Sequence, residues 1–391
     1  MIIGIVTLQN SNNYGAMYQV YALSKYLKNL GYDVFILDYE MTRDNANLLN
    51  YIKNPISFFK KILYRREQVI SKIFKKKNTI AKINRKEGFI NIFRNFRGNY
   101  LNITKEEYNY QKLVKNCPKA DAYICGSDQI WAADFLFTSP AFLLGFVPNG
   151  TKKISYAASF GKNKIESYLN NVFSKYINKF DAISVREKSA ISIVEKFSKL
   201  EPIHVLDPTL LLKKEDYLEI IDYSLVPDES YIFVYKLNQD KELSDWMDKS
   251  INLISEKNNH SVLAVSTNLI YPFDGNYREL HPTPGQLLGL IEKSSLTVTN
   301  SFHGTVFSII LQTKFLSFSR DSYKDKQNVR IEELLSNLNL EKFYCEPFLD
   351  VKEVYKKLSI ENNYKNVFEK LAKMRNISEN FIEKALKVER K

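Results

Sequence analysis

The sequence contains little cysteine, histidine and tryptophan, and it has no long apolar run. Three cysteines occur among 391 residues, at Cys117, Cys125 and Cys345, and none belongs to a CxxC pair. An odd number of such widely spaced cysteines excludes a disulfide framework and favours a reducing cytoplasm. The first residues lack the basic and long apolar regions of a secretory signal peptide. No stretch reaches the roughly 20 apolar residues that a membrane-spanning helix requires.

Common catalytic and cofactor signatures are also missing. Gly4 and Gly15 are wrongly spaced for the GxGxxG loop of a dinucleotide site, which disfavours NAD. No Walker loop, GxSxG or HExxH motif occurs. His204, His260 and His281 have no cysteine or histidine at ligand spacing, so we expect no metal site.

The composition is typical of a large folded protein with two domains. Hydrophobic residues make up 45% of the chain and charged residues 26%, which excludes a disordered protein. A length of 391 residues exceeds one ordinary core and suits two domains with additions. The 25 Phe and 25 Tyr are numerous, and core filling is the simplest explanation for them.

The net charge of +12 is concentrated in one segment. Residues 51–100 contain 14 Lys and Arg against two glutamates, so this segment carries +12 and the rest of the chain sums to zero. Aromatic and basic residues are interleaved within it at 58–66, 73–77 and 92–97. The pattern fits an interfacial helix on anionic lipid or a solvated helical insertion with its aromatics turned inward. A nucleic-acid surface is the weakest alternative, and we expect no nucleic-acid partner.

The first half of the chain alternates between strand and helix patterns. Residues 2–8 form a continuous apolar strand, 16–30 a helix that ends at Gly31, and 32–38 a second strand. This β-α-β unit implies a parallel sheet, and residues 51–100 interrupt it. Further strands are expected at 120–126, 153–159, 181–186 and 204–208, the last ending in a turn at Asp207 and Pro208.

A second set of the same elements begins near residue 228. We therefore predict an α/β protein with two Rossmann-like domains facing a cleft, a basic helical insertion and C-terminal helices. The expected strands are 231–235, 261–266, 296–299 and 314–318, the helices are 284–293 and 304–312, and two charged helices separated at 376–378 follow. The expected domains are residues 1–222, which include the insertion at about 51–100, residues 223–348, and a helical tail at 349–391.

Ligands of open α/β sheets bind beyond the carboxyl ends of the strands, which directs attention to four loops. Asn12 and Asn13 precede the first helix and either bind a polar ligand or form a plain turn. Arg186 follows an apolar strand and either clamps a carboxylate or phosphate or pairs with a neighbouring carboxylate. His303 begins a helix, where it either transfers a proton beside a bound anion or is a buried structural histidine. Asp128 either acts as a base towards a sugar hydroxyl or caps a following helix.

Six segments of the chain together resemble the polysaccharide pyruvyl transferase family. They occur in the family's order and cover most of residues 1–320, which makes a fairly specific signal. The segments are NSNNYGAMYQVYALSKYL (10–27), ADAYICGSDQIW (120–131), KISYAASFGK (153–162), DAISVREKSA (181–190), HVLDPTLLL (204–212) and VTNSFHGTVFSII (298–310).

The resemblance implies a fold like that of GT-B glycosyltransferases, with phosphoenolpyruvate as the donor and no cofactor. The three-carbon unit would become a cyclic ketal on two hydroxyls of one sugar, for example the 4,6 pair of galactose, with release of phosphate. The second domain would be the donor side. Residues equivalent to Arg186, in the first domain, and His303, in the second, would bind the donor. His303 and Asp128 are the candidate catalytic residues. The first domain would hold the acceptor, for which the candidate residues are Asn12, Asn13, Tyr14, Gln129 and Trp131.

One position departs from the family. Many members carry an arginine two positions before the histidine, where this chain has Ser301. One expected ligand for the anionic donor is therefore missing. The candidate replacements are the backbone at Ser301, Phe302 and Gly304 and the side chains of Arg320, Arg330 and Lys236.

Two other functions stay open at this stage. A glycosyltransferase that uses a nucleotide-sugar would have the same architecture. A non-catalytic module would dock onto a capsule-assembly complex through residues 51–100. For the pyruvyl transferase we expect a role in capsular or exopolysaccharide synthesis, a cytoplasmic location, and attachment to the inner membrane face if the acceptor is a lipid-linked oligosaccharide.

Overall fold

The computed structural model describes most of the chain in two compact units. The described residues are 1–40, 79–132, 140–161, 164–165, 167–266, 271, 273–320, 328–361 and 363–387, without the side chains of 79–87, 168 and 266. The first unit comprises Met1–His204 with Ile382–Lys391, and the second comprises Val205–Phe381. The aromatic and basic patterns at 58–66 and 73–77 lie outside the described residues.

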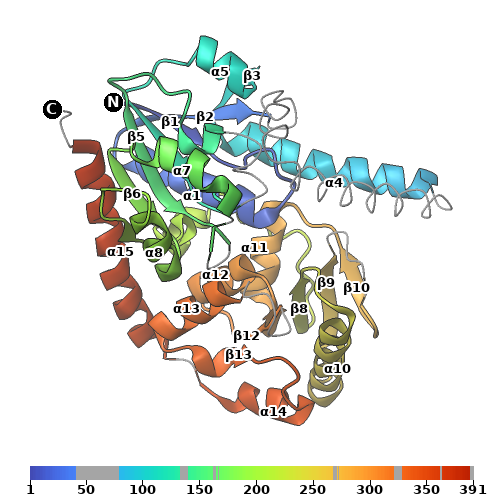
Figure 1. Ribbon diagram of the computed structural model, residues 1–391. Coiled ribbons are helices and arrows are strands. Elements are labelled where there is room, and N and C mark those ends of the chain that lie inside the picture. The colour runs from blue at the N-terminus through green and yellow to red at the C-terminus, as the bar shows by residue number, and fades with distance from the viewer. Residues whose placement is uncertain are drawn as a thin grey trace. The chain divides into compact units, whose positions relative to one another are not determined.

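The first unit is built on a seven-stranded sheet in which all neighbouring strands are parallel (Figure 1). The strand order is β3-β2-β1-β4-β5-β6-β7. The strands are β1 Ile2–Val6, β2 Asp33–Tyr39, β3 Ile103–Tyr108, β4 Ala122–Gly126, β5 Lys152–Ala158, β6 Ala182–Val185 and β7 Ile203–His204. The helices are α1 Tyr14–Asn29, α4 Thr79–Tyr100, α5 Tyr110–Lys115, α7 Asn170–Ile177 and α8 Lys188–Glu195, with the 3₁₀ helices η2 Pro140–Leu143 and η3 Ser167–Leu169.

Both faces of the inner strands are covered, which explains why strands such as β1 and β4 are continuously apolar in the sequence. On one face, Val6 and Cys125 belong to a core that also contains Phe173 of α7 and Ile193 of α8. On the other face α1 approaches β4 closely. A Cβ added at Gly126 would lie 2.6 Å from a methyl carbon of Leu23, so glycine permits this packing.

Helix α4 is the described part of the basic insertion, and it lies against α1 (Figure 1). Aromatic rings make the contact. The rings of Phe93 and Tyr14 are 4.9 Å apart, and those of Phe96 and Tyr21 are 6.2 Å apart. Phe93 and Phe96 therefore face inward, as one of the alternatives expected, whereas Tyr100 is exposed. Among the helices of the described ranges, none is both long and apolar enough to span a membrane.

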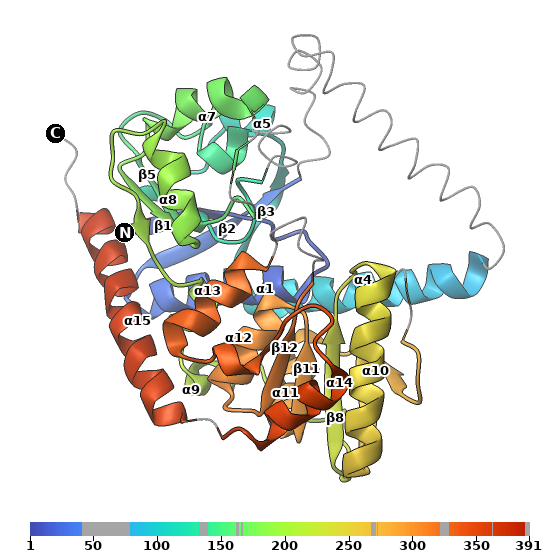
Figure 2. The same ribbon diagram turned by 60° about the horizontal axis from the view of Figure 1, so that its bottom comes forward.

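The second unit is built on a six-stranded parallel sheet of order β10-β9-β8-β11-β12-β13 (Figure 2). The strands are β8 Tyr231–Lys236, β9 Ser261–Ser266, β10 Arg278–Leu280, β11 Leu296–Thr299, β12 Phe315–Phe318 and β13 Tyr344–Cys345. The helices include α10 Lys241–Asn258, α11 Pro284–Lys293, α12 Phe302–Ile310 and α13 Val329–Leu338, and the 3₁₀ helix η5 covers Glu341–Phe343. Ile232 and Val234 pack with α10, whereas the Tyr231 hydroxyl points the other way and donates to the Leu290 carbonyl of α11.

Residues 205–222 belong to the second unit, although the sequence placed them in the first domain. They contain the 3₁₀ helix η4 Pro208–Leu210 and the short helix α9 Lys214–Tyr217. The Asp222 amide donates to the Gly285 carbonyl of α11, and the Tyr217 ring packs edge-on against Phe307 of α12. These contacts with α11 and α12 explain why the segment belongs with the second sheet.

The C-terminal segment contains α14 Val351–Lys356, the 3₁₀ helix η6 Lys357–Ser359 and α15 Tyr364–Lys387. The helix break expected at 376–378 is wrong, because α15 runs through it. Ser378 is fully buried, and its hydroxyl donates to the Met374 carbonyl and accepts the Leu206 amide. A serine that bonds back to its own helix in this way does not interrupt it.

The strand order reverses once in each sheet, between β1 and β4 and between β8 and β11. At such a reversal the loops that follow the two flanking strands diverge, and open α/β sheets bind their ligands there. The two Rossmann-like α/β units predicted from the sequence are confirmed. The loops that matter are those after β1 and β4 in the first unit and after β8 and β11 in the second.

Candidate functional site

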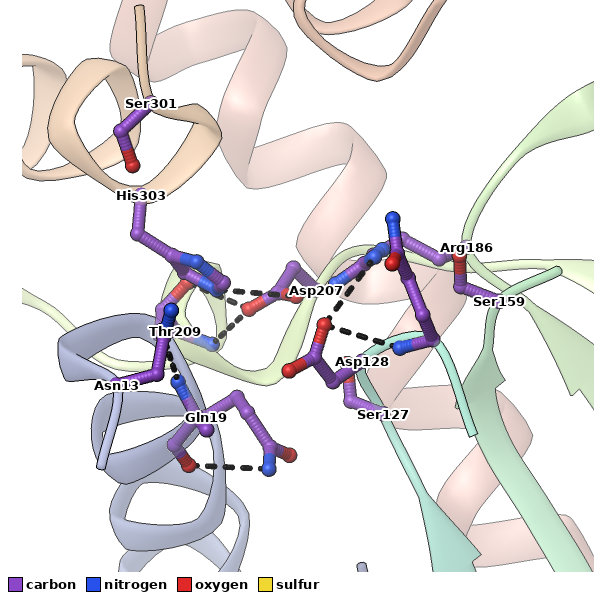
Figure 3. Close-up of polar contacts among 12 residues, drawn as sticks. Asn13, Gln19, Ser127, Asp128, Ser159, Arg186, Asp207, Thr209, Ser301 and His303 are labelled. Atoms are coloured by element: carbon purple, nitrogen blue, oxygen red, sulfur yellow. Dashed lines mark hydrogen bonds and ion pairs between the residues drawn. The ribbon is translucent and has the colours of Figure 1, made fainter. Parts of the chain in front are cut away.

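In the first unit, polar side chains gather at the carboxyl ends of the neighbouring strands β4, β5 and β6 (Figure 3). Arg186 Nε donates to Glu187 Oε1 at 3.1 Å, and the Ser159 hydroxyl donates to the same oxygen at 2.7 Å. Arg186 Nη2 lies 3.9 Å from Asp128 Oδ1. Three loops that are far apart in the sequence thus bring one guanidinium and two carboxylates together.

Arg186 is held firmly from its own backbone. Its amide donates to the Ala158 carbonyl at 3.2 Å, and a ring nitrogen of His204 donates to its carbonyl at 3.1 Å. Burial lowers the pKa of His204, and the hydrogen bond to the Arg186 carbonyl opposes this shift. Only 6% of Arg186 is exposed, so its charge acts in a poorly solvated setting. Pairing with a neighbouring carboxylate, one of the two expectations for Arg186, is therefore present, and clamping of an anionic ligand stays a prediction.

The backbone around Asp128 is strained. Asp128 has φ +65° and Ala157 has φ +52°, in the left-handed region that few residues other than glycine adopt. The register of β5 against β6 shifts between Ser155 and Ala158, which marks a bulge that redirects the chain after it. Asp128 Oδ1 accepts the Gln129 amide at 2.9 Å. No helix follows within residues 127–132, so Asp128 is not a helix cap there.

The acceptor-binding candidates are placed differently from one another. Asn12 and Asn13 are exposed, and Asn13 caps α1 by accepting the Ala16 amide. Gln129 is half-buried, and Tyr14 is buried against Phe93. Trp131 is wrong as a contact residue, because it lies fully inside the core of the first unit.

The indole of Trp131 explains this placement. Its N–H donates to the Phe142 carbonyl at 3.0 Å, and its ring packs edge-on against Phe173. A buried tryptophan needs such a partner for its single donor. The aromatic side chain therefore anchors the loop after β4 rather than touching a ligand.

In the second unit, the loops after β8 and β11 are tied together beside the start of α12. Asn300 Oδ1 accepts the Leu237 amide at 2.6 Å, and its Nδ2 donates to the Leu237 carbonyl and to Gln239. Ser301 is the N-cap of α12, and its hydroxyl accepts the Gly304 amide at 3.4 Å. A Cβ added at Gly304 would lie 2.4 Å from the Thr299 hydroxyl oxygen, so only glycine fits there.

His303 stands on the first turn of α12 with 7% of its surface exposed. Its Nε2 lies 3.7 Å from Asp207 Oδ2, which comes from the segment before η4 (Figure 3). The amides at the beginning of a helix and the helix dipole favour a bound anion beside this ring. The position therefore suits proton transfer next to an anionic ligand.

Two arginines lie near Ser301, the position at which many family members carry an arginine. Burial raises the pKa of Tyr235 to about 12, while a hydrogen bond with Ser301 and the nearby charge of Arg320 oppose the rise. Arg320 Nε donates to the Asn238 carbonyl at 3.1 Å, in the loop after β8. The guanidinium of Arg330 lies over the Phe302 ring at 5.8 Å. Two arginines from the segments after β12 thus lie near the first turn of α12.

Lys236 is wrong as an anion ligand. Its Nζ lies 2.5 Å from Asp248 Oδ1, and it stands over the Phe273 ring at 4.5 Å. Burial lowers the pKa of Lys236 and raises that of Asp248, and each partner counteracts the effect on the other. The lysine, 1% exposed, is part of a buried ion pair behind β8.

The sequence missed Asp207 and Glu187 as members of these clusters. Asp207 was taken as a strand-ending turn, but the strand β7 ends at His204, and Asp207 Oδ1 instead caps η4 by accepting the Thr209 amide. The sequence does not show that the Asp207 side chain is buried, and its burial beside His303 is what marks it as part of the site. In the part of the chain that the structure describes, no group of three His, Cys, Asp or Glu could hold a metal ion.

Comparison with solved structures shows the fold. UDP-N-acetylglucosamine 2-epimerase from Rickettsia bellii is 12% identical with a TM-score of 0.50, over 98% of this chain and 95% of that one. The UDP complex of S. aureus MnaA is 11% identical with a TM-score of 0.50, over the same shares. These likenesses support the expected GT-B-like fold and concern the fold alone. A search of curated proteins finds no match.

A family model decides the classification. The model of the polysaccharide pyruvyl transferase family matches residues 13–322, a range that includes Asp128, Arg186, Asp207 and His303. The match spans well over half of the 391 residues. The chain is therefore a transferase that belongs to the polysaccharide pyruvyl transferase family.

Proposed function

We propose that the protein transfers the pyruvyl group of phosphoenolpyruvate to two hydroxyls of one sugar and releases phosphate. The product is a cyclic ketal, for which the 4,6 pair of a galactose is our candidate acceptor. The observation that carries the proposal is His303 on the first turn of α12, nine-tenths buried beside Asp207, in a chain of this family. Such a ring suits a reaction that begins with protonation of an anionic substrate.

The first step is proton transfer to carbon. His303 donates its proton to the methylene carbon of phosphoenolpyruvate, which becomes a methyl group, and the adjacent carbon becomes electrophilic. One sugar hydroxyl attacks that carbon and forms the first C–O bond, while its proton passes to a base. Asp128 is our candidate for that base, since its carboxylate lies at the ligand-binding edge of the first sheet.

The second step replaces phosphate. The C–O bond to the phosphate breaks, the second hydroxyl attacks the same carbon, and the ring closes. The proton of the second hydroxyl passes to His303, and the proton of the first hydroxyl leaves with the phosphate. Overall, one proton is gained by the methylene carbon and one by the phosphate, so the two hydroxyl protons are accounted for.

The donor carries a carboxylate and a phosphate that need cationic or amide partners. We assign the carboxylate to Arg186, whose buried fork is suited to two parallel hydrogen bonds. We assign the phosphate to the amides of Phe302 and Gly304 with Arg320 and Arg330, which take the place of the arginine absent at Ser301. Asn12, Asn13 and Gln129 are left as candidates for the acceptor.

The proposal is tested by giving the protein phosphoenolpyruvate with a panel of galactosides and lipid-linked sugars. We expect phosphate release that depends on the sugar, and a product heavier by one pyruvyl ketal. A rise in melting temperature with phosphoenolpyruvate is expected as well. A rise with nucleotide-sugars alone, without phosphate release, would instead support the glycosyltransferase alternative.

We further propose that the protein acts in capsular or exopolysaccharide synthesis, in the cytoplasm, at the inner face of the membrane. The support is the charge of residues 51–100, which suits both an anionic leaflet and the diphosphate of a lipid-linked acceptor. Co-sedimentation with anionic vesicles that disappears at high salt is the expected result. Absence of binding at low salt would remove the membrane from the proposal. Vesicle binding by a protein that releases no phosphate would instead favour the non-catalytic docking module.

A further inference from the structure

Asp207 contacts Thr209 with one carboxylate oxygen and faces His303 with the other. Its Oδ1 accepts two hydrogen bonds from Thr209, one from the amide at 3.0 Å and one from the hydroxyl at 2.6 Å. Its Oδ2 is the atom that lies 3.7 Å from His303 Nε2 (Figure 3). Because Thr209 fixes one oxygen, the carboxylate cannot rotate without breaking both bonds. The second oxygen is thereby directed at the ring.

The segment that carries Asp207 is held on both sides. The Leu206 amide donates to Ser378, and the Tyr217 hydroxyl donates to the Thr209 carbonyl at 2.9 Å. Arg375 donates through Nε to the Leu210 carbonyl at 2.9 Å. The Asp207 side chain itself is fully buried. A carboxylate buried and fixed in this way is suited to orienting a neighbouring ring.

The two nitrogens of His303 have different surroundings. Nε2 is buried and makes no hydrogen bond with a described residue, and Asp207 Oδ2 lies 3.7 Å from it, within ion-pair distance. Distances between catalytic partners are often long before substrate binds and shorten in the complex. A carboxylate beside Nε2 favours a proton on that nitrogen. In the neutral ring Nδ1 is then the nitrogen without a proton.

We infer that Asp207 is the positioning residue of His303, that it keeps a proton on Nε2, and that His303 exchanges the catalytic proton through Nδ1. The role in catalysis rests on the proposed function, whereas the arrangement of the ring does not. The imidazolium donates its Nδ1 proton to the methylene carbon of phosphoenolpyruvate. The neutral ring then has Nδ1 ready to accept the proton of the second hydroxyl, and Asp207 stabilises the charged form between these events.

The test replaces the carboxylate by an amide of the same shape. In Asp207→Asn, both Thr209 donors still need the carbonyl oxygen, so the NH₂ group faces Nε2. An NH₂ group can only donate, which forces Nε2 to accept and puts the proton of the neutral ring on Nδ1. We expect kcat to fall about 10²- to 10⁴-fold with KM for phosphoenolpyruvate changed by less than about threefold. A kcat like that of the wild type would overturn the role.

A second measurement does not need turnover. In ¹⁵N-histidine-labelled protein, we expect the neutral ring of His303 to carry its proton on Nε2 in the wild type and on Nδ1 in Asp207→Asn. His303→Gln identifies the resonance among the four histidines. The same tautomer in both proteins overturns the inference even if no substrate has been found. Failure of wild-type protein to release phosphate, with the tautomers as expected, overturns the proposed function alone.

The matched control is Asp350→Asn. Asp350 is likewise an aspartate N-cap of the second unit, and its Oδ1 accepts the Lys352 amide at 2.8 Å. We expect this variant to keep the wild-type kcat and the wild-type His303 tautomer. An equal loss of kcat in both variants would assign the effect to capping, and would overturn the positioning role of Asp207.

Discussion

Replacing His303 with alanine is expected to lower kcat for ketal formation about 10²- to 10⁴-fold, the usual range for loss of a general acid and base. The reason is that no other titratable group stands on the first turn of α12 to protonate the methylene carbon. The helix itself keeps its Ser301 cap, so folding should survive. Phosphate release at saturating phosphoenolpyruvate measures the effect, and the circular dichroism spectrum checks the fold.

The control for this variant is His281→Ala, at an exposed position before α11. It removes an imidazole without touching either cluster, and it should keep the wild-type rate. Since His303→Ala leaves Asp207 without its ring, His303→Gln is included to retain a polar neighbour for the buried carboxylate. Rates near wild type in both His303 variants would mean that another group protonates the donor.

Arg186 gives the second large effect, on donor binding rather than on chemistry. In Arg186→Lys the positive charge stays, but the fork that makes two parallel hydrogen bonds is lost. We expect KM for phosphoenolpyruvate to rise about 10²-fold, with a smaller change in kcat. Steady-state kinetics separate the two constants, and Arg278→Lys, at an exposed position, is the control that should change neither.

Alanine at position 186 needs a compensating change. Arg186→Ala removes the cation beside Glu187, which is 5% exposed, and a buried unpaired carboxylate costs about 3 kcal/mol or more. The double variant Arg186→Ala with Glu187→Gln removes that cost and leaves the donor without its proposed clamp. An unchanged KM in a folded double variant would assign Arg186 to structure alone.

The core of each sheet was predictable because buried parallel strands leave continuous apolar runs. β1, β4, β8 and β11 were found in this way, and they are the strands that flank the two reversals of strand order. The short edge strands β3, β10 and β13 were missed, and the strand expected at 204–208 coincides with β7 only at His204. β3 is polar and partly exposed, and β7 and β13 have two residues each, so neither pattern nor length marks them.

The site residues that sequence identified are those that follow a recognisable strand. Arg186 and His303 are of this kind, whereas Asp207 lies in an irregular segment whose partner is almost a hundred residues away. Lys236 and Trp131 also follow or end strands, but the former pairs with Asp248 and the latter with the Phe142 carbonyl. Position along a strand therefore predicts which edge a residue reaches, and only tertiary partners decide whether it faces a ligand.

The first unit is assembled from two segments that the second unit separates in the sequence, and this has a consequence for how the protein is made. Residues 205–381 form the second unit without interruption, so all of its elements leave the ribosome before Ile382 does. The first unit receives its last segment after that, when Lys152 can bond to the Leu386 carbonyl. Domains generally fold as units during synthesis. Here the amino-terminal unit is the one that must wait until the residues from Ile382 onward have been made.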